Sequence, residues 1–367
     1  MKFTVEKSAF VEALASVQSV VPSRSTLQIL SNAMLKAEDG AVVLSTTNLD
    51  VSIRCSIAAK VDEPGATTLP VKRLSGIVRE LRDGAIEISV DSGDTATIQS
   101  GASFFKIVGL SVRDFPPIPE PESKVCFTLG ADVFREMLRK TSYAVSEDES
   151  RRIITGVLLA FKDGKLTTVA TDGRRLALVE HEVEFPPEIE TELVLPAKSV
   201  NELTRLLKDE GDVKIFAQKG LAIFQYGDTL LVTKLIDGSF PNYRQVIPQS
   251  FEERVEVARE DLFVALRRVS VISSEDKTVP TKLTFSGSEL VITMENPEVG
   301  EAREVVPIKY EGKDLAFTFN PEYVMDPLRN MDSDLVYIEL SGGHGPATFK
   351  CDLPFLYVLM PLRTSGQ

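Results

Sequence analysis

A short polar turn between two apolar segments carries the side chains of this chain that are best suited to chemistry. In TVATDGRRLALVE, residues 168–180, an acid stands just before a pair of bases. Asp172 could act as a catalytic acid, and Arg174 and Arg175 could grip the phosphates of a nucleic acid. Asp-Gly is also a favoured pair at the corner of a β-hairpin, so a purely structural turn is a third interpretation.

An enzyme would need further reactive groups, and the chain offers few of them. It has two histidines, His181 and His344, and three widely spaced cysteines. Neither set has the spacing of a metal site. GGHGPA at 342–347 is typical of a turn, and no glycine-rich loop that could hold a phosphate is present. We therefore expect no catalytic residue, no metal and no cofactor.

The bulk composition predicts a globular protein with an acidic surface. The chain has 367 residues, of which 43% are hydrophobic and 26% charged, and its formal charge is −13. No run of about 18 apolar residues could span a membrane, and the opening MKFTVEKSAF lacks a signal-peptide pattern. These features predict a cytoplasmic protein. The total charge argues against a simple basic nucleic-acid binder, although the placement of charge matters more than its sum.

One design is written three times along the chain. Each copy has a short alternating strand, a polar residue, and then apolar residues at helical spacing, in residues 3–25, 127–150 and 255–278. Phe10, Phe134 and Phe263 fall at the same place in the three copies. A fixed period of this kind is the signature of a repeated structural unit.

A second helix is predicted downstream in each copy, over 69–84, 195–211 and 319–334. Each opens at Pro or Asn-Pro, which suits the first helical turn. Pro327 lies inside the third of these helices and should kink or shorten it. Segments with alternating apolar residues, typical of β-strands, fill the rest.

The predicted fold is therefore α+β, with three repeated β-rich domains that each hold two helices. We place the domains at residues 1–121, 122–249 and 250–367. The proline-rich stretches 115–124 and 246–254 are interpreted as linkers.

Simple geometry suggests what such domains could build. A domain of this size is roughly 35 Å across, and six in a ring leave a hole of about 35 Å. A DNA duplex is roughly 20 Å wide, so two chains joined head to tail could encircle it. The formal charge of the predicted helices is +5, which leaves −18 for the remainder of the chain. It is counted over residues 8–20, 71–82, 131–142, 197–208, 259–270 and 320–330. Helices that face the axis would give a mildly basic lining, which suits sliding better than tight binding.

Five motifs in order make the chain similar to a known family. They are MKFTVE at the start, EPGATTLP (63–70), TVATDGRRLA (168–177), TKLIDGSFPNYRQVIP (233–248) and YVLMPLR (357–363). With these the whole chain resembles the bacterial DNA polymerase III sliding clamps, the beta subunit family. The resemblance implies the DNA clamp fold, with helices lining a ring formed by a head-to-tail homodimer. It also implies no catalytic activity and loading by an ATP-driven clamp-loader complex.

The resemblance further implies a peptide-binding cleft between the second and third domains, used by the replicative DNA polymerase, the loader and repair proteins. By position, its residues are Ile154, Thr171, Gly173, Arg174, Arg175, Leu176, Pro241, Val246, Tyr323, Val358, Met360, Pro361, Leu362 and Arg363. Their chemistry agrees, because an apolar floor with an adaptable methionine suits varied hydrophobic anchors. Arginines at the rim can pair with carboxylates or carbonyls of a partner.

The resemblance also assigns contacts to double-stranded DNA and to the ring seam. The DNA-binding candidates are Arg24, Lys72, Arg73, Arg151, Arg152 and Lys198. Basic residues on the helices are weaker candidates from position alone: Arg79, Arg82, Arg139, Lys140, Arg205, Arg267 and Arg268. The dimer interface is expected to use Phe104, Phe105 and Ile107 of the first domain against Val271 and Ile272 of the third.

Two positions depart from the family pattern. Position 174 is often His in TDGHRL-type members but is Arg here, which makes the cleft rim permanently charged. Arg152-Ile153 replaces an aromatic pair, so we expect phosphate contact there and no base stacking. Asp172 is then interpreted as the hairpin corner. The alternative function is a monomeric peptide-binding scaffold that does not encircle DNA.

Overall fold

The computed structural model describes residues 1–367 except 23, 25, 123–124, 274–278, 343–344 and 363–367. The chain divides into two compact units. Unit 1 combines residues 1–135 with 198–235, and unit 2 combines residues 136–197 with 236–367. The division falls inside the second predicted repeat, and each antiparallel sheet lies within one unit.

The first sheet of unit 1 has an alternating burial pattern. Phe3 and Val5 are buried on one face of β1, and Ile86 and Ile88 of β7 match them. This period of two is what a half-buried strand requires. In order across the sheet the strands are β5 (Lys60–Glu63), β1 (Lys2–Glu6), β7 (Ala85–Val90), β8 (Thr95–Ser100) and β9 (Ser103–Val108).

The second sheet of unit 1 joins strands of the first and second repeats through the pairing of β4 with β17. We call this pairing the first junction. In order the strands are β10 (Phe127–Gly130), β15 (Asp212–Gln218), β16 (Leu221–Tyr226), β17 (Thr229–Lys234), β4 (Val51–Ala58), β3 (Ala41–Thr47), β2 (Asn32–Glu38) and β6 (Gly65–Pro70).

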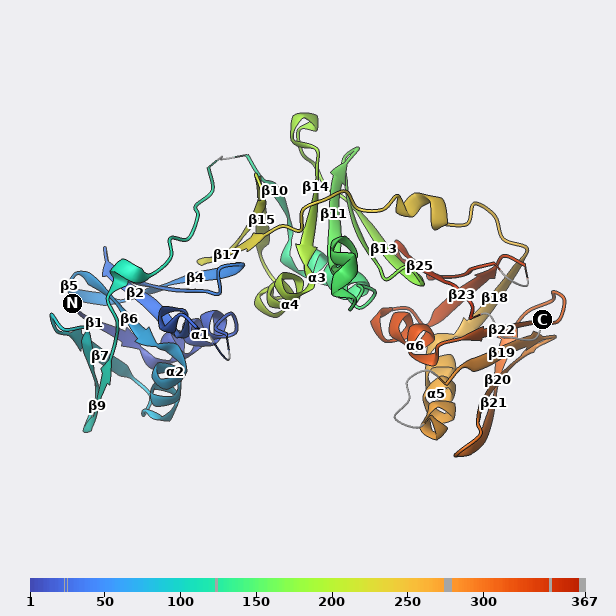
Figure 1. The fold of residues 1–367 in the computed structure, drawn as a ribbon, viewed down its shortest axis with the longest axis horizontal. Helices are drawn as coiled ribbons and strands as arrows, with labels where there is room; N and C mark the ends of the chain where they lie inside the picture. The colour runs from blue at the N-terminus through green and yellow to red at the C-terminus, as the bar shows by residue number, and fades with distance from the viewer. Residues whose placement is uncertain (23, 25, 123–124, 274–278, 343–344, 363–367) are drawn as a thin grey trace. The chain divides into compact units, whose positions relative to one another are not determined.

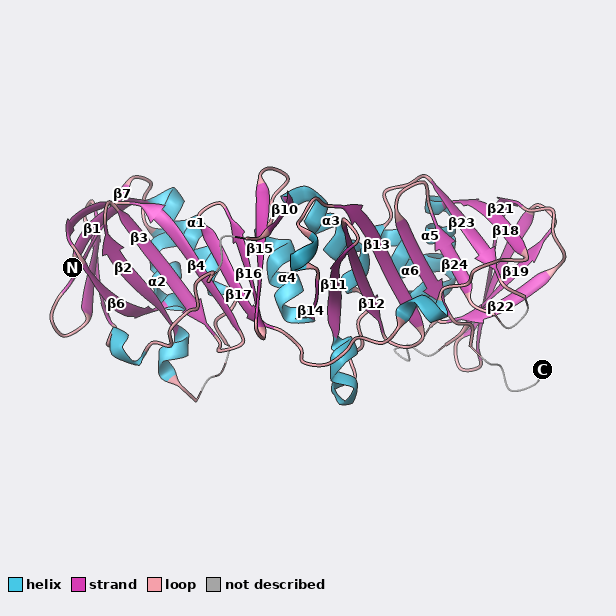
Figure 2. Cartoon of the chain, turned by 90° about the horizontal axis from the view of Figure 1, so that it is seen from above, coloured by secondary structure: helices cyan, strands magenta, loops and turns pink. Residues whose placement is uncertain are grey.

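Unit 2 contains one long sheet, which Figure 2 shows as a row of strands. It joins the second and third repeats where β13 pairs with β25, and Leu176 lies opposite Val358 there. We call this pairing the second junction. In order the strands are β14 (Thr191–Pro196), β11 (Gly156–Lys162), β12 (Lys165–Thr171), β13 (Arg175–Glu182), β25 (Phe355–Leu359), β24 (Ala347–Lys350), β23 (Leu335–Leu340), β18 (Glu253–Ala258), β21 (Gly300–Lys309), β20 (Glu289–Asn296), β19 (Thr281–Ser286) and β22 (Leu315–Phe319).

Each repeat holds two α-helices, as the sequence predicts. In unit 1 α1 packs against α2, and in unit 2 α5 packs against α6 (Figure 1). The α-helices are α1 (Lys7–Gln18), α2 (Val71–Glu80), α3 (Ala131–Ser142), α4 (Ala197–Leu206), α5 (Arg259–Val269) and α6 (Pro321–Asn330). The shorter 3₁₀ turns are η1 (Gln28–Ser31), η2 (Val112–Asp114), η3 (Glu149–Thr155), η4 (Pro187–Ile189), η5 (Tyr243–Val246) and η6 (Ser270–Ile272).

The first helices of the repeats share one apolar face. The buried residues of α1 stand at spacings of three, one and three, and those of α5 repeat the spacing from Leu262. Phe10 and Phe134 are each the fourth residue of their helix, and in α5 that place belongs to Leu262. The predicted equivalence of Phe263 is therefore wrong by one residue, because Phe263 is half-buried beside the apolar face.

Pro327 does not shorten α6, so of the two predicted effects, a kink or a shorter helix, the second is wrong. The helix has ten residues, the same length as α2 and α4. A proline inside a helix leaves the carbonyl four residues earlier without its usual donor. That carbonyl belongs to Tyr323, and it accepts a hydrogen bond of 2.7 Å from the Tyr357 hydroxyl of the neighbouring strand. The tertiary contact thus replaces the missing helical bond.

Described residues of both predicted linkers are packed or paired with the rest of the chain. Phe115 is buried, and Ile118 packs against apolar clusters of unit 1. The second linker overlaps β18, which begins at Glu253. The three-repeat organisation stands, while the predicted boundaries at 121/122 and 249/250 remain predictions.

Candidate functional site

The TDGRR turn forms a tight corner between β12 and β13. One Asp172 carboxylate oxygen accepts hydrogen bonds from the backbone N–H groups of Arg174, at 2.8 Å, and Arg175, at 3.0 Å. The Thr171 hydroxyl donates to the Arg175 carbonyl at 2.6 Å and accepts from the Gly173 N–H. Gly173 has φ of 87°, which glycine adopts without a steric cost. Asp172 is thus a structural corner, as one of the three interpretations predicts.

Arg175 connects this corner to α6 and to the end of α3. Its Nε donates to Asp172 at 3.1 Å, and its two Nη atoms donate to Asp326 at 2.5 Å and to the Tyr143 carbonyl at 2.6 Å. The guanidinium also lies over the Tyr323 ring, 4.1 Å from its centroid. The side chain is 9% exposed. The donors of Arg175 thus serve the protein itself, and a role for this side chain in the cleft stays a prediction.

The electrostatics around Arg175 keep it charged. Burial alone would lower the pKa of the guanidinium, but the hydrogen bond to Asp326 and the charges of Asp326 and Asp172 act in the opposite direction, and the pKa is raised. Burial also raises the pKa of the Tyr357 and Tyr143 phenols well above their ordinary value. The phenols thus stay neutral near pH 7, and Arg175 faces two carboxylates, those of Asp172 and Asp326.

An apolar cluster lies beside the corner on β11, β12, β13 and β25. Leu176 and Val358, two predicted cleft residues, are at its centre and are almost fully buried. The other members were not predicted from the sequence: Leu158, Ala160, Val169, Val194 and Ile236, with the partly buried Ile153, Leu178, Phe240, Tyr243, Ile247 and Leu356 packed against them. The signal was present, because β11 and β12 carry apolar residues on both faces, as a covered sheet requires.

The segment that follows β25 presents exposed apolar side chains on a backbone that hydrogen bonds hold in place. The Met360 N–H donates to the Arg174 carbonyl at 2.9 Å, and the Leu362 N–H donates to the Thr318 carbonyl at 2.7 Å. Met360 is nevertheless 45% exposed, and Leu362 39%. Fixed backbone and free apolar side chains are what a pre-formed site for hydrophobic anchors needs.

A pocket of about 440 Å³ lies on the same sheet, next to the segment that contains η5. Its lining mixes aromatic, apolar and charged side chains: Leu158, Ala160, Lys162, Asp163, Lys165, Thr167, Glu180, Glu192, Phe240, Pro241, Asn242, Tyr243 and Arg244. Pro241 is the one predicted cleft residue in this lining. Tyr243 both lines the pocket and packs on the apolar cluster, so the two features adjoin.

The structure thus brings together part of the predicted cleft. Direct contacts join Thr171, Gly173, Arg174, Arg175, Leu176, Tyr323, Val358 and Met360. No contact of this kind joins Ile154, which is buried, or Pro241, Val246, Pro361 and Leu362 to that group. The cleft role of all these residues stays a prediction. Arg363 lies outside the described residues.

The six predicted DNA-binding residues are all exposed. In the described part of the chain, Lys72, Arg73, Arg152 and Lys198 take part in no ion pair, which leaves their charges available to phosphates. Arg151 differs, because its guanidinium donates to the Asp172 carbonyl at 2.8 Å. It is thereby held against the TDGRR corner. The DNA-contact assignments remain predictions.

Several of the weaker basic candidates have partners inside their own unit. Arg139 and Lys140 pair with Asp332 at 2.9 Å, which ties α3 to the end of α6. In unit 1 Arg205 of α4 donates to the carbonyls of Ala15 and Ser16 at the C-terminal end of α1. A cation is favourable at that end of a helix. These arginines and the lysine hold repeats together, so their charge is partly neutralised.

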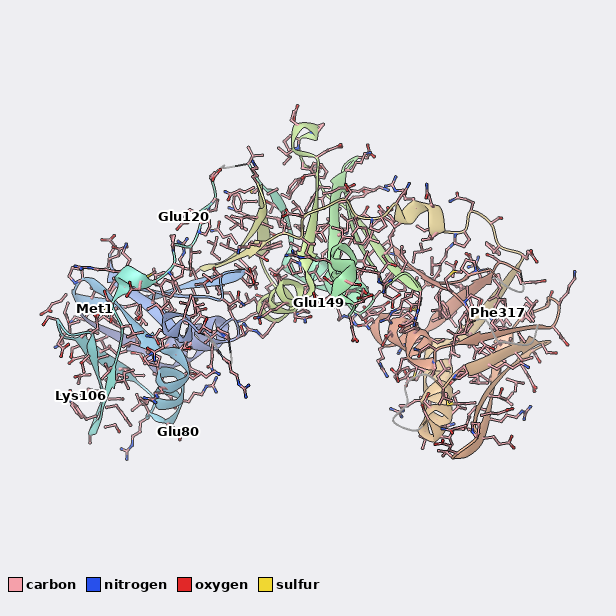
Figure 3. The ribbon with its side chains drawn as sticks, viewed as in Figure 1. Met1, Glu80, Lys106, Glu120, Glu149 and Phe317 are labelled. Atoms are coloured by element: carbon pink, nitrogen blue, oxygen red, sulfur yellow. The ribbon has the colours of Figure 1, made fainter. Side chains whose placement is uncertain are left out.

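The predicted seam residues lie at exposed places in each unit. Strand β9 is at the edge of its sheet, and it exposes Phe104 (58%) and Phe105 (38%) beside Lys106, which Figure 3 labels. Ile107 is 9% exposed and has little surface left for a partner. Val108, which the sequence analysis missed, is 71% exposed on the same edge. An open edge strand with exposed aromatics is a surface that soluble proteins normally cover.

The other half of the predicted seam lies in unit 2. Val271 in η6 is 79% exposed. Ile272 is half-buried, and its carbonyl accepts a hydrogen bond from the Asn296 amide at 3.2 Å. The pairing of these residues with β9 of another chain remains a prediction.

The described residues contain no cluster of three His, Cys, Asp or Glu side chains that could hold a metal ion. His344 lies outside the described residues, and His181 is exposed on β13. Among the helices that the structure describes, none is long and apolar enough to cross a membrane.

The whole chain matches one protein family, domain by domain. Residues 1–119 match the N-terminal domain of the DNA polymerase III beta subunit, residues 128–242 its central domain and residues 244–363 its C-terminal domain. The beta sliding clamp of Chlamydia muridarum is 33% identical over 363 residues and covers 99% of both chains. That of Escherichia coli K12 is 33% identical over 371 residues, 99% of this chain and 100% of the other.

Solved structures agree in three dimensions. The DNA polymerase sliding clamp from Bacillus subtilis is 28% identical, with a TM-score of 0.95 over 99% of both chains. The sliding clamp from Bartonella birtlesii bound to griselimycin is 35% identical, with a TM-score of 0.94 over 99% of this chain and 100% of that one. The predicted resemblance is confirmed: the chain belongs to the bacterial DNA polymerase III beta subunit family, the beta sliding clamps.

Proposed function

We propose that two copies of this chain close into a ring around duplex DNA and slide along it in the bacterial cytoplasm. The chain then tethers the replicative polymerase and other replication and repair proteins through peptides bound at the second junction. The observation that carries the proposal is the full-length match to sliding clamps, domain by domain.

Size and symmetry support a closed dimer. Three repeats in one chain become six in two, and six domains of this size leave a hole of about 35 Å. Head-to-tail contacts close into a ring when their rotation allows it. The exposed edge of β9 and the exposed Val271 supply two different apolar surfaces, as a head-to-tail contact requires.

Charge supports sliding. Lys72 and Arg73 on α2 and Lys198 on α4 are exposed, and in the described residues they form no ion pair. A few such cations attract DNA of any sequence through its phosphates. The chain as a whole has a formal charge of −13, which disfavours tight binding of DNA to the outer surface of the protein. A ring needs little affinity, because it is retained by enclosure.

The second junction supports a peptide-binding role. Leu176 and Val358 belong to a buried apolar cluster, and Met360 and Leu362, which follow Val358 in the chain, are exposed on a backbone held by hydrogen bonds. Arg174 adds an exposed charge at the corner. The clamp of Bartonella birtlesii binds griselimycin, and we propose that this chain binds it at the second junction.

The proposal is tested by retention on DNA. Loaded onto nicked circular plasmid by a clamp loader, the chain should stay bound through a gel-filtration column in 0.5 M salt, and cutting the circle once should release nearly all of it. Enclosure predicts this result, because salt weakens phosphate contacts while a closed circle still threads the ring. The measurement is the fraction of labelled protein that elutes with the plasmid.

Charged substitutions at the seam provide the control. Phe104→Asp with Phe105→Asp should abolish retention on the circle and halve the particle mass in sedimentation. Arg24→Glu should leave the mass unchanged. Comparable retention on linear DNA with free ends, or a stable monomer at micromolar concentration, would favour the peptide-binding scaffold that does not encircle DNA.

A further inference from the structure

The first junction of unit 1 reproduces the backbone of the second junction of unit 2. Asn48 accepts from the N–H groups of Asp50 and Val51 at 3.0 and 2.8 Å, as Asp172 does in its own corner. The Lys234 N–H donates to the Asp50 carbonyl at 2.9 Å, which matches the bond from Met360 to Arg174. Strands β2, β3 and β4 correspond to β11, β12 and β13 with an offset of 124 residues. A groove homologous to the proposed peptide site therefore exists in unit 1.

The side chains of this first groove are polar where those of the second are apolar. Ser45 and Ser52 stand where the second repeat has Val169 and Leu176. Arg54 takes the place of Leu178, and Lys36 that of Ala160. A cavity of about 590 Å³ remains in the groove, lined by Met34, Lys36, Glu38, Val43, Ser45, Arg54, Ser56, Glu120, Pro121, Gln225, Gly227, Asp228, Thr229 and Leu230.

A segment of the chain itself already lies in this groove. We call residues 115–120, FPPIPE, the strap; Figure 3 labels Glu120 at its end. Ile118 packs on the cluster that contains Leu230 and Val232, and also on the cluster of Ile29, Leu30 and Phe115. The strap is therefore anchored by an apolar side chain, as a bound peptide would be.

The end of the strap is recognised through charge. Both Glu120 carboxylate oxygens accept from Arg54, one from each Nη, with the Nη2 bond at 2.8 Å. The Gln218 side-chain amide donates to the Glu120 carbonyl at 3.1 Å. The hydrogen bonds from Arg54 hold the pKa of Glu120 below its ordinary value. A two-pronged arginine contact of this kind selects a carboxylate by geometry as well as charge.

One buried polar group that lines the groove forms no hydrogen bond with the strap. Ser45 is fully buried, and its hydroxyl has no hydrogen-bond partner among the described residues. A buried hydroxyl without a partner costs free energy, and a ligand donor or acceptor that reached it would recover that cost.

We propose that the first groove is a second peptide-binding site of the chain and that the strap is its built-in ligand. The external ligand is an extended, proline-containing segment of a partner protein, with an apolar residue two positions before an acidic one. Ile118 and Glu120 show this spacing in the strap, and the Arg54 fork and the Ile118 clusters supply the matching contacts. The two sites of one chain would thus accept different peptides, one hydrophobic and one acidic.

The strap masks the site in the unmodified chain. A tethered ligand acts at an effective concentration in the millimolar range, so a free peptide at micromolar concentration competes poorly. The apparent affinity equals the intrinsic affinity multiplied by the fraction of molecules in which the strap has left the groove. A partner that binds elsewhere on the ring would gain the same advantage of tethering and could displace the strap.

The test uses the labelled peptide Phe-Pro-Pro-Ile-Pro-Glu and the full chain, with binding followed by fluorescence anisotropy. Ile118→Ser with Glu120→Gln weakens the strap and should raise the affinity for the peptide at least tenfold. Adding Arg54→Leu, which installs the residue of the second groove, should remove that gain. A peptide that ends in Gln should bind the strap variant at least fivefold more weakly than the Glu peptide.

A charge exchange covers the case in which the strap variant folds poorly. Arg54→Glu should favour the peptide that ends in Lys over the one that ends in Glu, as the reverse of the native preference. Equal binding of all peptides, no gain in the strap variant, or doubling of its particle mass without peptide would overturn the proposal. Griselimycin binding at the second junction should be unchanged throughout, which separates this outcome from a failure of the proposed function.

Discussion

Replacing both Met360 and Leu362 with aspartate is expected to weaken griselimycin binding at least about 100-fold while the protein stays folded and dimeric. Both side chains are well exposed, so the substitution removes little that the free protein uses. In the complex each would bury only the part that is now exposed, worth roughly 0.6–1.3 kcal/mol, and a carboxylate in its place must also lose its water, which costs more. Together these terms exceed the roughly 2.7 kcal/mol that corresponds to 100-fold.

Isothermal titration with griselimycin measures the effect, and sedimentation checks the dimer. Val299→Asp is the matched control, because Val299 is a similarly exposed apolar residue of unit 2 on the β20–β21 hairpin. It should leave affinity within twofold. Equal affinity of the double variant and the control would place the ligand away from the second junction and remove the main support for the cleft.

The sequence predicts the repeat, and through it most of the architecture. A period near 124 residues shows that one unit recurs, and prolines at helix starts locate the second helices to within a few residues. These features are local, because propensity and periodicity act along the chain. The error at Phe263 has the same origin. The three copies are matched at their phenylalanines because these are conspicuous residues, whereas the apolar face of a helix is defined by all of its buried positions.

Contacts between repeats could not be predicted in the same way. Nothing near Pro327 in the sequence announces that the Tyr357 hydroxyl will bond to the Tyr323 carbonyl. The same is true of the strap, whose prolines indicate a linker although Ile118 is packed on two clusters. Such contacts join residues that are far apart in sequence, so a single chain read without its fold gives no signal for them.

In the candidate site, too, some features follow from the sequence and others only from the fold. Family motifs identify Leu176, Val358 and Met360, and the structure joins these three around one corner. The two adjacent arginines have equal chemistry in the sequence, and the fold makes them different. Arg174 is exposed at the corner, whereas Arg175 is nearly buried because Asp326 of a distant helix meets it.

That difference gives the second large prediction: Arg175→Ala should destabilise unit 2, and Arg174→Ala should not. Removing Arg175 leaves the Asp172 carboxylate without its cation and takes one of two cations from Asp326, which also pairs with Arg329 at 3.2 Å. Both carboxylate side chains are at most 20% exposed. Breaking a buried ion pair on one side typically costs about 3–5 kcal/mol. An exposed substitution away from such contacts usually changes stability by less than about 0.5 kcal/mol.

Differential scanning calorimetry and hydrogen exchange measure the consequence. For a unit of this size, such a loss of unfolding free energy lowers the temperature at which unit 2 unfolds by roughly 10 °C. Backbone amide hydrogens should exchange faster where β13 pairs with β25. Those of β5, β1 and β7 in unit 1 should keep their rates and serve as the internal reference. Asp326→Asn with Arg175→Met removes both charges of one of the two ion pairs, although Asp172 stays charged, and should recover part of the loss, since an uncompensated carboxylate costs more than an absent pair. If the Arg175→Ala and Arg174→Ala variants unfold at the same temperature, Arg175 does not stabilise the contact between the TDGRR corner and α6. It would then be free to bind partners at the cleft, as its position beside Arg174 suggests.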